Sequence, residues 1–138
     1  MLDDVGPFDA KLQYSEDWDM WVRVAKSGYY FDFVPEPLFR YFIHDSNISK
    51  TAKLSGFLAD RLEALKKYES LFIKYGPSYS RVLENIGTLY LLIGQRREAR
   101  LFLIKSIKAN IFNLKSCVKY SLTFFGKGVY GFLRKSIK

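Results

Sequence analysis

The sequence predicts a mainly α-helical protein, and three observations lead to this expectation. From about Thr51 to Ile107, apolar residues recur every three or four positions, which is the spacing of one buried helix face. Glycines interrupt that pattern at Gly76 and Gly94, where they would end one helix before the next begins. Only a short stretch before residue 45 has the mixed pattern of one helix followed by strands. The expected architecture is therefore a helical bundle or hairpin stack preceded by a small α/β segment.

Length and composition fit one compact domain, or a small domain with an appendage, because the chain has 138 residues of which 49% are hydrophobic. The aromatic share of 17% is typical of cores, interfaces or a membrane surface. One cysteine, Cys117, and one histidine, His44, exclude an internal disulfide and offer no zinc site. The sequence shows no signal peptide and no apolar run of about 18 residues. We therefore expect a cytoplasmic, reducing environment.

Charge is divided unevenly along the chain. Residues 1–45 hold nine acids and four bases, a balance of −5, whereas residues 46–138 hold eighteen bases and five acids, a balance of +13. After Glu98 there are nine lysines or arginines and no acid. This asymmetry predicts two units with different neighbours: carboxylate chemistry in the first, and an anionic surface beside the second.

The first segment is expected to contain one helix and two strands. Ser15 is a suitable N-cap, and Gly28 is a suitable stop. Helical spacing places four residues on one face and predicts that they pack in the core: Trp18, Trp21, Val22 and Ala25. Residues 29–34 and 38–43 are rich in strand-forming side chains and are separated by a proline pair, so we expect two short strands.

The second segment is expected to form three helices, over residues 54–75, 79–93 and 99–107. One set of residues in it resembles a single tetratricopeptide helix pair, in which small residues let two helices approach: Leu83, Ile86, Gly87, Tyr90, Gly94, Ala99 and Leu103. A generic helical hairpin explains the same residues, because a single copy of a repeat is a weak signal. Either form implies packing or partner binding, without chemistry of its own.

The tail from residue 113 is basic and aromatic, and we expect it to be irregular because three glycines, Gly126, Gly128 and Gly131, weaken any helix there. The predicted organisation is thus a first segment over residues 1–49, a helical segment over residues 50–112 and a tail over residues 113–138. The tail has three interpretations. It lies on an anionic membrane surface, it is a solvated basic face, or, ranked last, it binds nucleic acid.

The densest cluster of chemical groups is Glu16-Asp17-Trp18-Asp19. One interpretation is structural, since acids in the first turn complement a helix dipole. The flanking residues favour a second interpretation. They are Gly6-Pro7-Phe8-Asp9, Leu12, Met20-Trp21-Val22-Arg23, Gly28-Tyr29, Val34-Pro35-Glu36-Pro37-Leu38, Tyr41 and His44. In this order they resemble the end of the catalytic domain in family 2 glycosyltransferases of the GT-A type, over residues 6–49.

The resemblance implies a role for each matching residue. Asp17 matches the general base, which takes the proton of the acceptor hydroxyl as that oxygen attacks the nucleotide sugar with inversion at the anomeric carbon. Glu16 matches a second catalytic carboxylate, which shapes the acceptor pocket or orients the base. Trp18 and Asp19 would lie on the acceptor and sugar side. His44 matches the histidine that approaches the diphosphate or its metal.

Two positions depart from the family pattern. Ala10 stands where the family usually has Glu, and Phe42 stands where it has Arg. Because alternate strand residues share a face, Arg40 would take the place of that arginine on the diphosphate side. The short α/β segment is then the remnant of a GT-A domain, with one helix and two strands.

The donor half of such an enzyme is not in this sequence. The resemblance implies a preceding nucleotide-sugar-binding domain whose Asp-x-Asp motif binds Mg²⁺ or Mn²⁺, and no such motif precedes Glu16. We therefore expect the isolated chain to bind no metal and to be inactive. The full-length enzyme would act at the cytoplasmic face of a membrane on a nucleotide sugar and a hydroxyl acceptor. The chain could also pair as a homodimer. The alternative function is a helical interaction module with a vestigial glycosyltransferase segment.

Overall fold

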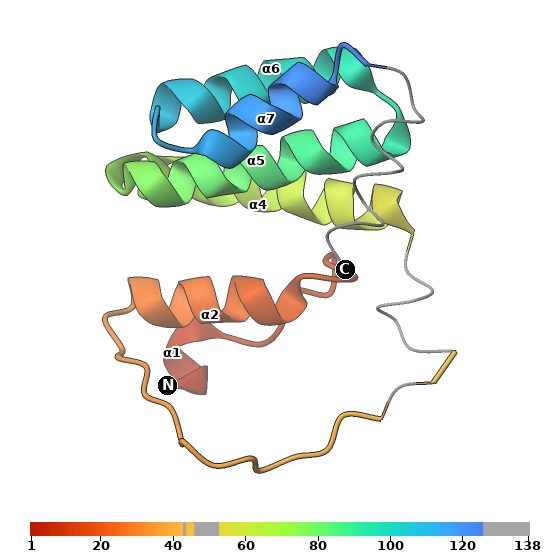
Figure 1. Cartoon of the computed structure of the whole chain (residues 1–138). Coiled ribbons are helices and arrows are strands. Elements are labelled where there is room, and N and C mark those ends of the chain that lie inside the picture. The colour runs from red at the N-terminus through yellow and green to blue at the C-terminus, as the bar shows by residue number, and fades with distance from the viewer. Residues whose placement is uncertain (43, 46–52, 126–138) are drawn as a thin grey trace. The chain divides into compact units, whose positions relative to one another are not determined.

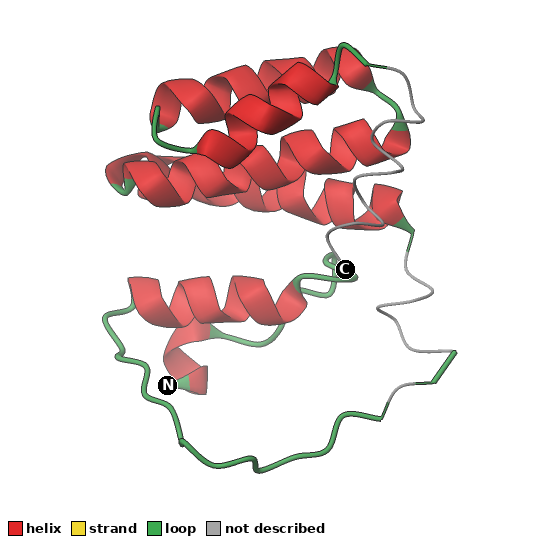
Figure 2. Ribbon diagram, in the orientation of Figure 1, coloured by secondary structure: helices red, strands yellow, loops and turns green. Residues whose placement is uncertain are grey.

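The computed structural model describes residues 1–42, 44–45 and 53–125, and in these ranges it has six helices and no strand (Figure 1 and Figure 2). The predicted mainly α-helical class is therefore confirmed. The chain divides into two compact units, Met1–Asp60 and Arg61–Lys138. Three predicted features lie outside the described residues: the strand end at residue 43, the boundary at 49–50, and the glycines of the tail.

The first unit contains α1 (Leu2–Val5) and α2 (Glu16–Lys26), and the beginning of α4 (Leu54–Lys74) also belongs to it. The turn before α2 is fixed by Asp60, whose carboxylate accepts hydrogen bonds from the amides of Gln13 at 3.1 Å and Tyr14 at 2.7 Å. The Tyr14 ring also packs on Phe57, with 4.7 Å between ring centroids. A Cβ atom at Gly56 would overlap the Tyr14 ring, so this contact requires glycine.

The two predicted strands, 29–34 and 38–43, are absent: the described residues 29–42 form no ladder and run as an open segment (Figure 2). The prediction rested on aromatic and branched residues, which stabilise a strand only when a neighbouring strand supplies backbone partners. No described segment supplies such a neighbour. Large apolar side chains in this segment are consequently exposed, including Tyr30 (100%), Phe33 (80%) and Phe39 (83%).

The second unit begins within α4 and continues through α5 (Gly76–Ile93) and α6 (Arg96–Ala109), close to the three predicted helices. The predicted long helix is interrupted, because Tyr68 has non-helical φ/ψ values inside α4. Gly94 ends α5 with φ of +95°, a conformation that favours glycine. The two-residue link makes α5 and α6 an antiparallel hairpin (Figure 1). Its core contains Leu83, Ile86 and Leu103, each no more than 1% exposed.

A sixth helix, α7 (Leu114–Leu122), lies in the tail and packs on α6 and α5 (Figure 1). The expectation of an irregular tail is therefore wrong for these residues. Asn113 is the N-cap of α7, and its side-chain oxygen accepts a hydrogen bond from the Ser116 amide at 3.3 Å. Asn is one of the residues favoured at an N-cap, and this signal was not used in the sequence prediction.

Candidate functional site

The acidic first turn of α2 separates its carboxylates by environment. Asp19 is fully buried, Glu16 is half-buried and Asp17 is exposed. The three acids therefore do not crowd into one solvated face. Each has a different set of neighbours, and each can do different chemistry.

Asp19 holds the start of the chain against α2. Its carboxylate accepts a hydrogen bond from Arg23 Nε at 2.9 Å, one helical turn along. The Arg23 guanidinium also donates to the backbone carbonyls of Val5, Gly6 (3.2 Å) and Pro7 (2.7 Å). A buried carboxylate that is paired in this way is structural, because one partner removed would leave the other charge unpaired. The geometry thus gives Asp19 a structural role beside the sugar-side role that the resemblance implies.

The helix start itself is incompletely satisfied. Ser15 stands at the predicted N-cap position, but its φ of −143° and ψ of 20° come with no side-chain capping bond. Its Oγ is buried without a hydrogen-bond partner among the described residues, and the same holds for Glu16 Oε2. A buried polar group left unpaired costs about 1–3 kcal/mol. The first turn of α2 therefore carries two buried polar groups that are unpaired among the described residues.

Asp17 is the accessible carboxylate of the turn. Its Oδ1 accepts a hydrogen bond from the Trp18 amide at 2.6 Å, while Oδ2 has no partner among the described residues. Trp21, which spacing predicted to lie in the core, is 53% exposed and meets Phe31 edge-on at 5.7 Å. Trp18 is half-buried. An exposed carboxylate beside an exposed indole is an arrangement suited to a hydroxyl-bearing ring.

The diphosphate-side residues lie in the open segment. Arg40 and His44 are both exposed, and Arg40 has no ion pair within the described residues. Because no strand forms there, the shared strand face proposed for residues 40 and 42 is not present. Among the described residues, no three His, Cys, Asp or Glu side chains gather closely enough to bind a metal ion.

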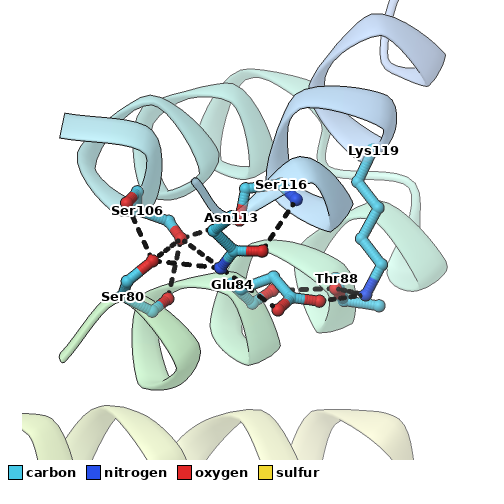
Figure 3. Close-up of polar contacts among 7 residues, drawn as sticks. All are labelled: Ser80, Glu84, Thr88, Ser106, Asn113, Ser116 and Lys119. Atoms are coloured by element: carbon cyan, nitrogen blue, oxygen red, sulfur yellow. Dashed lines mark hydrogen bonds and ion pairs between the residues drawn. The ribbon is translucent and has the colours of Figure 1, made fainter. Parts of the chain in front are cut away.

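A second polar cluster, which the sequence did not reveal, joins α5, α6 and α7 (Figure 3). Ser80 and Ser106 are fully buried and hydrogen-bond reciprocally, each hydroxyl donating to the other's backbone carbonyl at 2.9 Å and 2.7 Å. Ser116 lies 2.7 Å from Ser106 Oγ, and Asn113 Nδ2 donates to Ser80 Oγ at 3.0 Å. Every hydroxyl proton in this cluster has an acceptor, so the network is closed.

An ion pair extends the network toward solvent. Lys119 Nζ donates to Glu84 Oε1 at 2.6 Å and to Thr88 Oγ1 at 2.9 Å (Figure 3). Glu84 is only 7% exposed, whereas the Lys119 side chain is 26% exposed. The pair therefore links α7 to α5 at the edge of the buried cluster. This ion pair holds α7 against α5, a function that apolar contacts usually have in packed helices.

A cleft of about 830 Å³ opens beside this network. Its lining residues are Pro77, Arg81, Glu84, Asn85, Asn110, Phe112, Asn113, Leu114, Lys115 and Lys119. Glu84 is already paired with Lys119, while Arg81 and Lys115 have no ion pair within the described residues. The cleft thus has the composition of a binding surface and lacks a free carboxylate that would act as a base.

No family model matches the chain, no curated protein matches its sequence, and no solved structure matches its fold. Among the described helices, none has the length and apolar content needed to cross a bilayer. Function is therefore inferred from the residues and their geometry.

Proposed function

We propose that residues 1–49 form the acceptor-side end of an inverting glycosyltransferase of the family 2 type, with Asp17 as the general base. The observation that supports this most directly is the different environment of two carboxylates in α2. Asp19 is buried and bound to Arg23, while Asp17 is exposed with one carboxylate oxygen unpaired among the described residues. Only an accessible carboxylate can reach the hydroxyl of an acceptor.

In the proposed reaction, Asp17 accepts the proton of the acceptor hydroxyl while that oxygen forms a bond to the anomeric carbon. The bond from this carbon to the nucleoside diphosphate breaks, and the diphosphate leaves from the opposite face with the bonding electrons. Glu16 would orient the acceptor or Asp17. Arg40 and His44 would lie on the side of the leaving diphosphate.

The nucleotide sugar and the divalent metal, Mg²⁺ or Mn²⁺, would be bound by a preceding domain. The exposed aromatic residues of segment 29–42 support this proposal, because apolar side chains at this density usually pack against another part of a protein. The helices from α4 onward would then be an extension of the catalytic domain at the cytoplasmic face of a membrane.

The test uses the full-length enzyme that contains this chain, assayed by release of nucleoside diphosphate from a panel of nucleotide sugars. Replacing Asp17 by Asn should lower turnover by about 10²–10⁴-fold while nucleotide-sugar binding is retained, because general-base catalysis has this magnitude. Asp3→Asn is the matched control, since Asp3 is an exposed acid in the first turn of α1. It should leave turnover unchanged.

Retention of full turnover by Asp17→Asn would exclude Asp17 as the base. The alternative proposal is a helical interaction module with a vestigial glycosyltransferase segment, which the cleft lined by Arg81, Asn113 and Lys115 favours. If the wild-type protein turns over no nucleotide sugar, this alternative replaces the enzyme proposal.

A further inference from the structure

Helix α7 packs on its neighbours through a serine and its C-cap threonine, while two of its large apolar residues face outward. Ser116 and Thr123 are fully buried, whereas Leu114 is 73% and Val118 is 59% exposed. Leu114 and Val118 are four positions apart and therefore lie on one face of the helix. An ordinary surface helix has the reverse arrangement, because burial of apolar side chains drives its packing.

Hydrogen bonds fix this orientation. On the inner side, Ser116 joins the closed serine network, and the ion pair of Lys119 with Glu84 holds the middle of the helix. At the end of α7, Arg100 donates to Thr123 Oγ1 at 2.9 Å and to its carbonyl at 3.1 Å. A rotation that buried Leu114 and Val118 would break all of these contacts. The apolar face is therefore held outward by the fold.

Further exposed apolar residues lie directly before and after the helix. We define the outer set of α7 as the six exposed apolar residues Ile111 (67%), Phe112 (84%), Leu114 (73%), Val118 (59%), Phe124 (59%) and Phe125 (55%). Phe124 is held in place although it is exposed, because the Arg100 guanidinium lies 4.2 Å from its ring centroid. Six large exposed apolar residues in a stretch of fifteen mark a contact surface.

The charges around this set identify its partner. Residues 99–125 contain five lysines or arginines and no acid. Lys115 lies next to Leu114 on α7, is exposed, and has no ion pair within the described residues. Two copies of the chain that met through this same face would bring these like charges together. Anionic lipids, in contrast, offer an apolar layer beneath a negatively charged surface.

We propose that the outer set of α7 inserts into the interface of an anionic bilayer. The helix lies in the membrane plane, with Leu114 and Val118 directed toward the acyl chains and Lys115 among the headgroups. With nine residues, α7 is too short to span a bilayer, which needs about 20. This inference is independent of the proposed sugar transfer, because it uses only contacts of the second unit.

The experiment is co-sedimentation of the whole chain with vesicles of phosphatidylcholine alone or mixed with phosphatidylglycerol. The wild type should bind the anionic vesicles and lose binding as salt increases. The double variant Leu114→Ser/Val118→Ser should bind about tenfold or more weakly. Ile73→Ser/Leu101→Ser is the matched control, because these side chains are 57% and 61% exposed on α4 and α6. It should bind as the wild type does.

A third variant, Lys115→Glu, keeps the apolar set and should also weaken binding to anionic vesicles by more than tenfold, since each interfacial lysine contributes about fivefold. Circular dichroism should show that all variants remain helical. Unchanged binding of Leu114→Ser/Val118→Ser, or equal binding of the wild type to neutral vesicles, would overturn the proposal. So would a wild-type dimer that this double variant dissociates, in the absence of vesicle binding, because the occupant would then be a second copy.

Discussion

The two polar clusters of the molecule differ in how completely their groups are paired. In the first turn of α2, Ser15 Oγ and Glu16 Oε2 are buried without partners among the described residues, and Asp17 Oδ2 is exposed. In the cluster between α5, α6 and α7, every hydroxyl and the Glu84 carboxylate have partners (Figure 3). The described part of the chain thus includes an open polar cluster and a closed one.

The difference in pairing indicates different roles for the two clusters. A closed network gains its free energy within the fold, and a ligand could bind its groups only by replacing bonds that already exist. An open cluster keeps a cost of about 1–3 kcal/mol for each buried unpaired group. The sugar transfer that we propose uses the exposed Asp17 of the α2 turn, whereas the serine network orients the surface that α7 presents.

The closed cluster should be most sensitive at its ion pair. Lys119→Met leaves the Glu84 carboxylate buried without its cation and should lower the free energy of unfolding by about 2–3 kcal/mol. This lies below the range for a fully buried pair, because the Lys119 side chain is partly exposed. Urea unfolding followed by circular dichroism measures the change, with Lys115→Met as the control on the same helix. Equal stability of the two variants would mean that the pair does not support the network.

Two buried serines, one from each cluster, directly test whether the two clusters differ in pairing. Ser106 and Ser15 are 0% and 1% exposed, yet only Ser106 has hydrogen-bonded side-chain partners. Ser106→Ala should destabilise the chain by about 1–2 kcal/mol, because it leaves Asn113 and Ser116 short of partners. Ser15→Ala should instead raise the free energy of unfolding by about 1 kcal/mol, because it removes a buried hydroxyl without a partner among the described residues, in contrast to the loss expected at an ordinary N-cap serine. A cost at Ser15 equal to that at Ser106 would show that the α2 turn is also closed.

The sequence predicts the helices whose apolar residues face inward, because periodicity reports burial only in that orientation. Gly94 and the spacing around Leu83 and Leu103 indicated α5 and α6 close to their observed bounds. Helix α7 was missed for the same reason, since Ser116 and the C-cap residue Thr123 are buried while Leu114 and Val118 are exposed. The strands were wrongly predicted because their backbone partners are not set by local sequence.

The candidate site was predictable only in part. The pattern around Asp17 identified the acids, and the four-residue spacing of Asp19 and Arg23 was a visible signal for their ion pair. Which acid is buried could not be predicted, since Arg23 is fixed by carbonyls of the preceding loop. The network of Ser80, Ser106 and Ser116 depends on the packing of three helices, and isolated serines in a sequence give no sign of it.

The smallest predicted effect concerns a hydrogen bond outside the closed network. Tyr79 donates to Glu69 Oε1 at 2.9 Å, and burial, followed by this hydrogen bond to a carboxylate, raises the pKa of Tyr79 above its ordinary value of 10.0. The folded chain therefore keeps the phenol proton at a pH where the unfolded chain loses it. The resulting stabilisation is complete below pH 10 and is lost as pH rises through the folded pKa.

Tyr79→Phe should thus reduce the fall in stability above pH 10, measured by urea unfolding at a series of pH values. The control is Glu69→Gln. Its Tyr79 titration is measured by the ultraviolet absorbance of tyrosinate, after subtraction of the titration of Tyr79→Phe. This variant should lower the pKa of Tyr79 only part of the way toward its ordinary value, because burial is the larger cause of the raised pKa. If Glu69→Gln restores the ordinary titration completely, the carboxylate is the main cause, and polar contacts outside the serine network contribute more to the helical unit than we infer.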